Sequence, residues 1–276
     1  METDFFNYYF TKSLKIYSDK TSKFIYECNK KKDNEIINRI SRIYSHIYID
    51  EIQDLAGWDL EILKLLFNSK SQILLVGDPR QVTYLTHHSG KHPKYKNGKI
   101  KEFIRNECNR KKKVICDIDE TTLQKSHRNN KLICDFSSAL YPNYAACEPC
   151  DCQKCRNEVP DHQGVFLVKP EHVEEYRNKF SPTILREKSA IHPEWNYGKS
   201  KGLSFKRVLI YPTDKIRKYL TKGDVKEIES IKAKFYVALT RARHSVGIVF
   251  DYADNDGCFA FAETINYING LKIFKV

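Results

Sequence analysis

Short apolar runs and stretches with helical spacing follow one another along the chain, in the order that is typical of a parallel α/β protein. The runs HIYID (46–50) and ILLVGD (73–78) are short, apolar and end in an acid, and the stretch LEILKLLF (60–67) between them has helical spacing. Strand, helix and strand in this order predict a parallel β-α-β unit. Because parallel sheets bind ligands at the carboxyl ends of their strands, we expect Asp50 and Asp78 to border a ligand site.

A second α/β unit is predicted beyond a basic, turn-rich stretch at residues 86–113. Its elements are a helix near 130–140, strands at 164–168, 207–212 and 246–251, a helix that ends near residue 240 and a last helix over about 258–269. The change of pattern places the domain boundary between residues 114 and 123, so we expect domains at 1–118 and 119–276.

The first 45 residues read as polar helices. Aromatic residues at positions 5, 6, 9 and 10 have the spacing of one helix face. This spacing predicts a stripe of side chains that packs against the core.

Composition narrows the class of function. The chain has 276 residues, 41% of them hydrophobic, which is enough for a folded core. It contains no apolar run of about eighteen residues and no secretory signal pattern, so we expect a cytoplasmic protein with no membrane partner. The net charge of +12 favours nucleic acid as the partner, and a generally basic surface is the alternative.

Two strand ends carry residue types that serve phosphate chemistry. The first strand runs into IDEIQD (49–54), where one carboxylate can hold Mg²⁺ on nucleotide phosphates and its neighbour can activate water. The second runs into VGDPRQ (76–81), where Gly and Pro favour a tight turn that directs Gln81 to the same edge of the sheet. An amide there can hydrogen-bond a γ-phosphate. A chance pair of acids and an ordinary turn are the alternatives.

Two later segments carry basic groups. TRAR (240–243) lies near a predicted helix end, and KSKGLSF (199–205) precedes the strand at 207–212. An arginine opposite a nucleotide stabilises the charge that develops during phosphoryl transfer. An isolated TRAR is more often a solvated helix face.

Taken together and in this order, the segments form a recognisable set. DEIQD, VGDPRQ, SKGLSF and YVALTRAR resemble motifs II, III, V and VI of the UvrD/Rep/PcrA superfamily 1 DNA helicases, and LQKSHR (123–128) resembles motif IV. The resemblance covers roughly residues 45 to 250. It implies an α/β fold of RecA-like parallel sheets and ATP-dependent, 3′-to-5′ movement on or unwinding of DNA.

The resemblance assigns roles around ATP and Mg²⁺. It implies that Asp50 holds Mg²⁺, that Glu51 is the general base for water attack, and that Gln53 and Gln81 sense the γ-phosphate. Arg128 and Arg241 would contact the γ-phosphate from the second domain. Gly202 would border the nucleotide.

The resemblance also assigns contacts to DNA. Tyr84 stands where motif III has an aromatic residue that stacks on a base of single-stranded DNA, and a packed loop aromatic is the alternative. Lys199, Ser200 and Lys201 would touch the DNA backbone. The expected partner is single-stranded DNA, or a duplex with a single-stranded tail.

Departures from the family pattern matter as well. No G-x-x-x-x-G-K-[ST] phosphate-binding loop (Walker A) occurs in the sequence. We therefore expect an incomplete first RecA-like domain, a further N-terminal part or a partner chain that supplies the loop, and no hydrolysis by the isolated chain. A non-hydrolysing DNA-binding or regulatory subunit derived from a helicase is the alternative. Within the motifs, Ser126 and His127 replace Asn and Tyr, and Ser204 replaces the Glu that would meet the ribose.

A short Cys-rich insertion at about 145–160 lies outside the family pattern. Four of the nine cysteines fall within nine residues, at Cys147, Cys150, Cys152 and Cys155. Such spacing suits tetrahedral Zn²⁺ in a structural site. The alternatives are a site that borrows His162 or Cys134, a site that uses only three of these cysteines, and thiols that remain free or redox-active.

Overall fold

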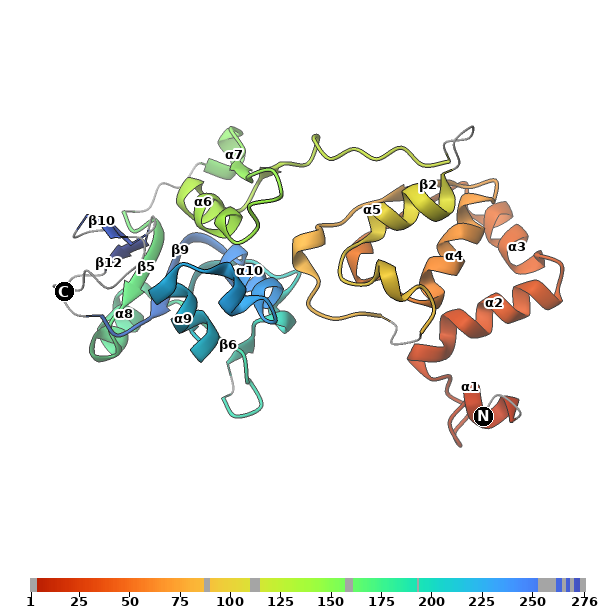
Figure 1. Cartoon of the computed structure of the whole chain (residues 1–276), viewed down its shortest axis with the longest axis horizontal. Coiled ribbons are helices and arrows are strands. Elements are labelled where there is room, and N and C mark those ends of the chain that lie inside the picture. Colours follow the sequence, from red (N-terminus) through yellow and green to blue (C-terminus); the bar gives the residue numbers. More distant parts are fainter. Residues whose placement is uncertain are drawn as a thin grey trace. The chain divides into compact units, whose positions relative to one another are not determined.

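The chain forms two units, Met1–Ile118 (unit 1) and Asp119–Val276 (unit 2) (Figure 1). The structure is a computed structural model that describes residues 4–86, 90–109, 115–156, 161–192 and 194–252, and the backbone of 262–264, 267–268 and 271–273. The predicted basic stretch 86–113 and Cys-rich insertion therefore lie partly outside the described residues. No helix in the described part of the chain is both long and apolar enough to cross a membrane.

Unit 1 is a small α/β assembly. Its helices are α1 (Phe5–Tyr9), α2 (Thr21–Lys31), α3 (Glu35–Ile43), α4 (Trp58–Phe67) and α5 (Ile100–Phe103), and its strands are β1 (His46–Ile49) and β2 (Gln72–Leu75). The strands pair in parallel, from His46 opposite Gln72 to Ile49 opposite Leu75. The predicted β-α-β unit is therefore confirmed, with α4 as the crossover helix.

The two faces of the β1–β2 pair differ. Ile49 and Leu75 pack against a core that includes Leu60 of α4 and Phe103 of α5. Residues one position earlier point the other way: Tyr48 is 71% exposed and Leu74 is 53% exposed. No further strand of the described chain pairs with β1 or β2. One face of this sheet, with Tyr48 and Leu74 on it, is thus exposed.

The N-terminal aromatic stripe is only partly buried. Tyr9 is 1% exposed, but Phe5 and Phe6 are 46% and 53% exposed, so the expected core-facing stripe is wrong for these two residues. Helix α1 has only five residues, and the rings of Tyr9 and Phe5 lie 5.3 and 6.0 Å from that of Phe24 of α2.

Unit 2 is built on an eight-stranded sheet. Its helices are α6 (Lys131–Ala139), α7 (Gln153–Arg156), α8 (Val173–Phe180), α9 (Asp214–Lys222) and α10 (Lys232–Thr240). The sheet contains β5 (Gly164–Val168), β6 (Thr183–Arg186), β7 (Trp195–Asn196), β8 (Phe205–Tyr211), β9 (Ala242–Val249), β10 (Ala262–Thr264), β11 (Tyr267–Ile268) and β12 (Leu271–Ile273). A separate short pair joins β3 (Lys125–Ser126) to β4 (Glu148–Pro149).

The strand order in the large sheet is β10-β11-β12-β5-β9-β8-β6-β7. Every pair from β12 to β7 is parallel. The predicted α/β class with parallel sheets is confirmed. The predicted last helix at 258–269 is wrong where it can be compared, because 262–264 and 267–268 form antiparallel strands. The β-branched and aromatic residues Thr264, Tyr267 and Ile268 favour strand geometry there.

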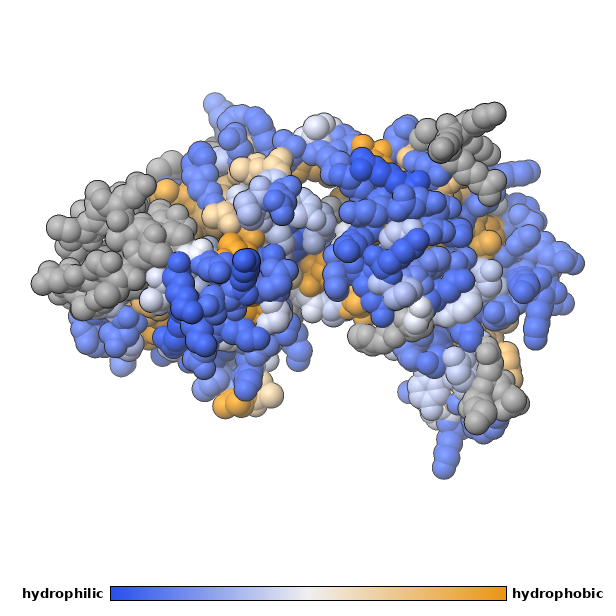
Figure 2. Space-filling view, in the orientation of Figure 1, coloured by the Kyte–Doolittle hydropathy of each residue, from blue (hydrophilic) through white to orange (hydrophobic). Residues whose placement is uncertain are grey.

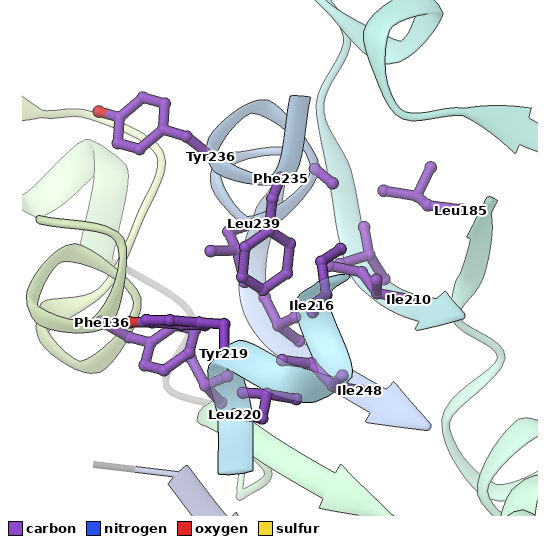
Figure 3. Packing of buried hydrophobic residues seen from close by; sticks show 14 of the residues in the cluster. Phe136, Leu185, Ile210, Ile216, Tyr219, Leu220, Phe235, Tyr236, Leu239 and Ile248 are labelled. Atoms are coloured by element: carbon purple, nitrogen blue, oxygen red, sulfur yellow. The ribbon is translucent and has the colours of Figure 1, made fainter. Parts of the chain in front are cut away.

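Alternating strand residues build two cores. Val208 and Ile210 of β8 join the larger cluster under α6, α9 and α10, in which Phe235 of α10 is fully buried (Figure 3). Leu209, between them, faces the opposite way and packs with Tyr176 of α8. Helices therefore cover both faces of the sheet, as expected for parallel strands.

The surface visible in Figure 2 is mostly hydrophilic over both units. The composition agrees with this hydrophilic surface, since the mean hydropathy is −0.57 and 30% of the residues are charged. Exposed apolar side chains are therefore notable where they gather, as on β1 and β2.

We predict that Phe235→Ala destabilises unit 2 by about 3–5 kcal/mol, because it leaves a cavity at the centre of the larger core. The control is Leu123→Ala, since Leu123 is 78% exposed, and we expect a change within about 0.5 kcal/mol. Urea denaturation followed by circular dichroism measures both. Equal midpoints for the two variants would contradict this packing.

Candidate functional site

Acids and amides meet at the carboxyl ends of β1 and β2. Asp50 follows β1 and is exposed, and its Oδ1 accepts a hydrogen bond of 2.7 Å from the Glu51 amide. Glu51 has a left-handed backbone, with φ of 56°, which costs a non-glycine residue about 1–2 kcal/mol. The Gln53 side-chain amide donates to the Glu51 carboxylate. These bonds hold both acids in place in a strained turn, a feature common at functional sites.

The two strand ends approach each other closely. Gln53 is 1% exposed, and its Oε1 accepts a hydrogen bond of 3.0 Å from the Asp78 amide. A Cβ atom on Gly77 would lie 2.4 Å from Gln53 Oε1 and 2.8 Å from Ile52 Cγ1. Glycine is thus required at position 77 by this close approach, and not by its φ angle.

Asp78 fixes the next two polar side chains. Its Oδ1 accepts from Arg80 Nε at 2.8 Å, and its Oδ2 accepts from Gln81 Nε2 at 3.0 Å. Burial alone raises the pKa of Asp78, but the hydrogen bonds and charge of Arg80, with the bond from Gln81, outweigh it and lower that pKa. The carboxylate is therefore ionised at neutral pH. The sequence predicted that Asp78 lies at the carboxyl ends of the strands, but it did not predict the hydrogen bond from Gln81 to Asp78.

The donor chemistry of this edge fits Mg²⁺. Magnesium prefers hard carboxylate oxygens and keeps several waters, so it is held by one or two carboxylates together with substrate phosphates. Asp50 is exposed and Glu51 is partly exposed, so both acids are accessible.

In unit 2, Arg128 connects three of the motif segments. Its Nε donates to Ser204 Oγ at 2.6 Å, and its Nη1 donates to the Thr240 carbonyl at 3.1 Å. Asn129 is buried and donates to the carbonyls of Thr240 and Ala242. Burial, and then the charge of Arg243, lower the pKa of the half-buried Arg128. Asn129 is a positioning residue that sequence reasoning missed.

Arg241 faces the interior of unit 2. Only 2% of it is exposed, and its guanidinium donates to the carbonyls of Val237 (3.1 Å) and Leu203 (3.3 Å). A contact between Arg241 and a phosphate therefore requires its side chain to move from this position.

The residues expected to touch DNA differ in exposure. Tyr84 is 60% exposed, Lys199 is exposed and Lys201 is partly exposed. Ser200 is fully buried, and its Oγ donates to the Tyr197 carbonyl at 2.6 Å, so it anchors the turn from inside. Gly202 has a left-handed φ of 81° and open space beside it.

Three of the four clustered cysteines come together with a histidine. Cys150, Cys152 and Cys155 group with His127, whereas Cys147 Sγ lies 4.0 Å from Cys134 Sγ. Hydrogen bonds from Cys155, and then from His127, lower the pKa of Cys152 to about 6. The position of His127 beside the cysteines was not predicted from the sequence. The only sequence feature that marked this residue was its replacement of the usual Tyr of motif IV.

The other histidine considered from sequence lies elsewhere. The His162 ring stacks on Phe166 and Phe180, with centroids 3.8 Å away in each case, and its Nε2 is 3.0 Å from the Tyr176 hydroxyl. It belongs to the aromatic packing around α8.

These acids and amides lie at the carboxyl ends of parallel strands, where open α/β sheets bind their ligands. Residues 5–86 match the model of the UvrD/REP helicase N-terminal domain. This segment is therefore similar to the N-terminal domain of UvrD-like helicases, as motifs II and III indicate.

Curated relatives match in part. A probable DNA helicase II homolog of Mycoplasma genitalium is 36% identical over 52 residues, 19% of this chain and 7% of the relative. The RecBCD enzyme subunit RecB of Borreliella burgdorferi is 36% identical over 55 residues, 20% of this chain and 5% of the relative. A probable DNA helicase II homolog of Mycoplasma capricolum is 26% identical over 136 residues, 49% of this chain and 15% of the relative. The chain thus spans a small part of each relative.

Solved helicase structures give two further matches. The arterivirus nonstructural protein 10 helicase in complex with DNA has a TM-score of 0.45 and 18% identity, over 78% of this chain and 42% of that one. The PRRSV helicase has a TM-score of 0.43 and 19% identity, over 77% and 36%.

We predict that Gly77→Ala destabilises unit 1 by about 1–3 kcal/mol, because the new methyl group overlaps the Gln53 amide and breaks its bond to Asp78. Gly90→Ala is the matched control, since nothing lies within 4 Å of a Cβ there. Urea denaturation gives the stabilities, and hydrogen exchange at residues 76–78 reports the broken bond. Unchanged exchange in Gly77→Ala would contradict the close approach.

Proposed function

We propose that the chain is the motor portion of an ATP-dependent DNA helicase or translocase, with 3′-to-5′ polarity as in the family it resembles. The observation that carries the proposal is the linked set of acids and amides at the ends of β1 and β2, inside the segment that matches the helicase family. This set has the carboxylates and amides that would hold Mg²⁺ and activate water, and their mutual bonds fix their positions.

Each group has a distinct task in hydrolysis. Asp50 would hold Mg²⁺, whose charge neutralises the phosphates. Glu51 would accept the proton of the attacking water, with its carboxylate oriented by Gln53. Gln81 would donate a hydrogen bond to the γ-phosphate from its side-chain NH2 group, whose nitrogen Asp78 positions.

The arginines of unit 2 supply positive charge. Arg128 is held by Ser204 and Thr240, so its guanidinium is already oriented. Arg241 would join it only after leaving the carbonyls of Val237 and Leu203. Such arginines stabilise charge on the transferred phosphoryl group. In this proposal the two units correspond to RecA-like domains, the first of them incomplete.

The open face of unit 1 supports a further polypeptide segment in the complete motor. Parallel sheets are normally covered on both faces, yet Tyr48 and Leu74 lie exposed on a sheet of two strands. We propose that an additional segment with a helix covers this face and carries the phosphate-binding loop. It would come from an N-terminal part of the same protein or from a partner chain.

DNA binding is assigned to exposed groups of both units. Tyr84 would stack on a base, and Lys199 and Lys201 would contact phosphates. Ser200 would support the loop that carries the two lysines. The substrate would be single-stranded DNA, or a duplex with a single-stranded tail.

We predict that the 276-residue chain alone hydrolyses ATP no faster than its Glu51→Gln variant, with or without single-stranded DNA, because its sequence lacks the loop that cradles phosphates. A phosphate-release assay measures the rates. DNA-stimulated hydrolysis that Glu51→Gln abolishes would show that the chain handles phosphate without the loop, and the proposed missing segment would be wrong.

A second experiment separates an incomplete motor from a non-hydrolysing subunit. The product encoded immediately upstream is added to the chain, and ATP binding and hydrolysis are measured again. Hydrolysis that appears with wild type and not with Glu51→Gln supports the incomplete motor. Binding of DNA without any nucleotide binding supports the regulatory subunit.

We predict that Tyr84→Ala weakens binding of an oligo-dT strand by roughly 5- to 150-fold, because one stacked base contributes about 1–3 kcal/mol. Tyr17→Ala is the control, since Tyr17 is 43% exposed and lies outside the motifs. Fluorescence anisotropy gives both affinities at one salt concentration. Equal affinities for the two variants would remove Tyr84 from the DNA site.

A further inference from the structure

Four potential metal ligands of unit 2 meet at one point. His127 directly follows β3 and Cys150 directly follows β4, and these strands pair in parallel with Ser126 opposite Pro149. Because parallel strands end at the same side, the two side chains leave the pair together, and the Cys150 amide donates to the Ser126 carbonyl at 2.9 Å. Cys152 and Cys155 follow in the turn and in α7.

The spacing of the ligand atoms is close to that of a tetrahedral zinc site. All four lie within 4.8 Å of one another. Cys150 Sγ is 3.5 Å from Cys152 Sγ, and His127 Nδ1 is 3.5 Å from Cys155 Sγ and 3.9 Å from Cys152 Sγ. In a tetrahedral zinc site, bonds of about 2.3 Å to sulfur and 2.0 Å to nitrogen place neighbouring ligand atoms about 3.5–3.8 Å apart. The observed set needs only small shifts to reach this geometry.

We propose that His127, Cys150, Cys152 and Cys155 bind one Zn²⁺. Thiolates and an imidazole suit zinc, whereas magnesium and calcium prefer oxygen ligands. Four protein ligands close the coordination sphere and leave no position for a reacting water, so the ion has a structural role.

Cys147 is outside this site although it belongs to the same Cys-rich segment. Its Sγ lies 4.0 Å from that of the buried Cys134. Its amide is held by Ser138 Oγ on α6 at 3.0 Å. The ligand set is therefore three cysteines and a histidine, and not the four cysteines that the spacing alone favours.

The metal would stabilise a weak piece of structure. Strands β3 and β4 have two residues each, and an isolated two-stranded pair is marginally stable at best. A cross-link from His127 to the Cys loop holds this pair and the segment that carries Arg128. Metal binding itself is independent of the proposed function; only the consequence for Arg128 rests on it.

Metal content of the purified chain tests the site. Plasma mass spectrometry is expected to find about one zinc per wild-type chain, as in a closed structural site. His127→Asn and Cys155→Ser should lose most of it, and Cys147→Ser should keep it. Absence of zinc from the wild type, or loss with Cys147→Ser and retention with His127→Asn, overturns the proposal.

A variant that replaces the histidine by another zinc ligand distinguishes loss of a ligand from misfolding. His127→Cys supplies a fourth thiolate, so it should retain zinc where His127→Asn does not. After exchange for Co²⁺, the wild type should show the strong visible bands of a tetrahedral site with sulfur ligands, and His127→Cys should shift them. Loss of zinc in His127→Cys, with circular dichroism like that of the wild type, contradicts a ligand role for position 127.

Hydrogen exchange tests the structural role. Removing the metal with a chelator should increase exchange in residues 124–130 and 148–156, while β8 and β9 remain protected by the core. Unchanged exchange in these two segments would contradict a structural cross-link, whatever the metal content.

Discussion

The hydrogen bond from the Asp78 amide to the Gln53 side chain sets the separation of the two strand ends in unit 1, and the candidate nucleotide site depends on it. Gly77 permits this approach because it has no Cβ atom. The other end of the Gln53 amide donates to Glu51, while the Asp78 carboxylate holds Gln81. The acid and both amides therefore form one connected chain of bonds, in which a displacement at Gln81 reaches Glu51 through two side chains.

In unit 2, the C-terminal end of helix α10 holds the candidate site residues in place. Thr240 is the last residue of α10, and the last carbonyls of a helix lack partners within it and carry partial negative charge. Arg128 and Asn129 both donate to the Thr240 carbonyl. A cationic guanidinium is favoured at this position. The segment that resembles motif IV is thus fixed by the end of the helix that contains most of the motif VI segment, and Ser204 adds a contact from motif V.

Periodicity predicted the elements whose signals are local. The β-α-β unit around α4 and the strands β5, β8 and β9 were found because apolar runs end in turn residues or acids. The ligand role of His127 and the inward positions of Ser200 and Arg241 could not be predicted, since they depend on contacts between distant segments. The short strands near 262–268 were mistaken for a helix because a few apolar residues fit either period.

The two sheets differ in how far their faces are covered. In unit 2, Leu209 on one face and Val208 on the other are both fully buried. In unit 1, Ile49 and Leu75 pack on the core while Tyr48 and Leu74 face solvent. Parallel strands with apolar side chains are thus buried on two faces in one unit and on a single face in the other. Because water contact with paired apolar side chains is unfavourable, a covering segment would stabilise unit 1 and leave the strand-end acids accessible at the edge of the sheet.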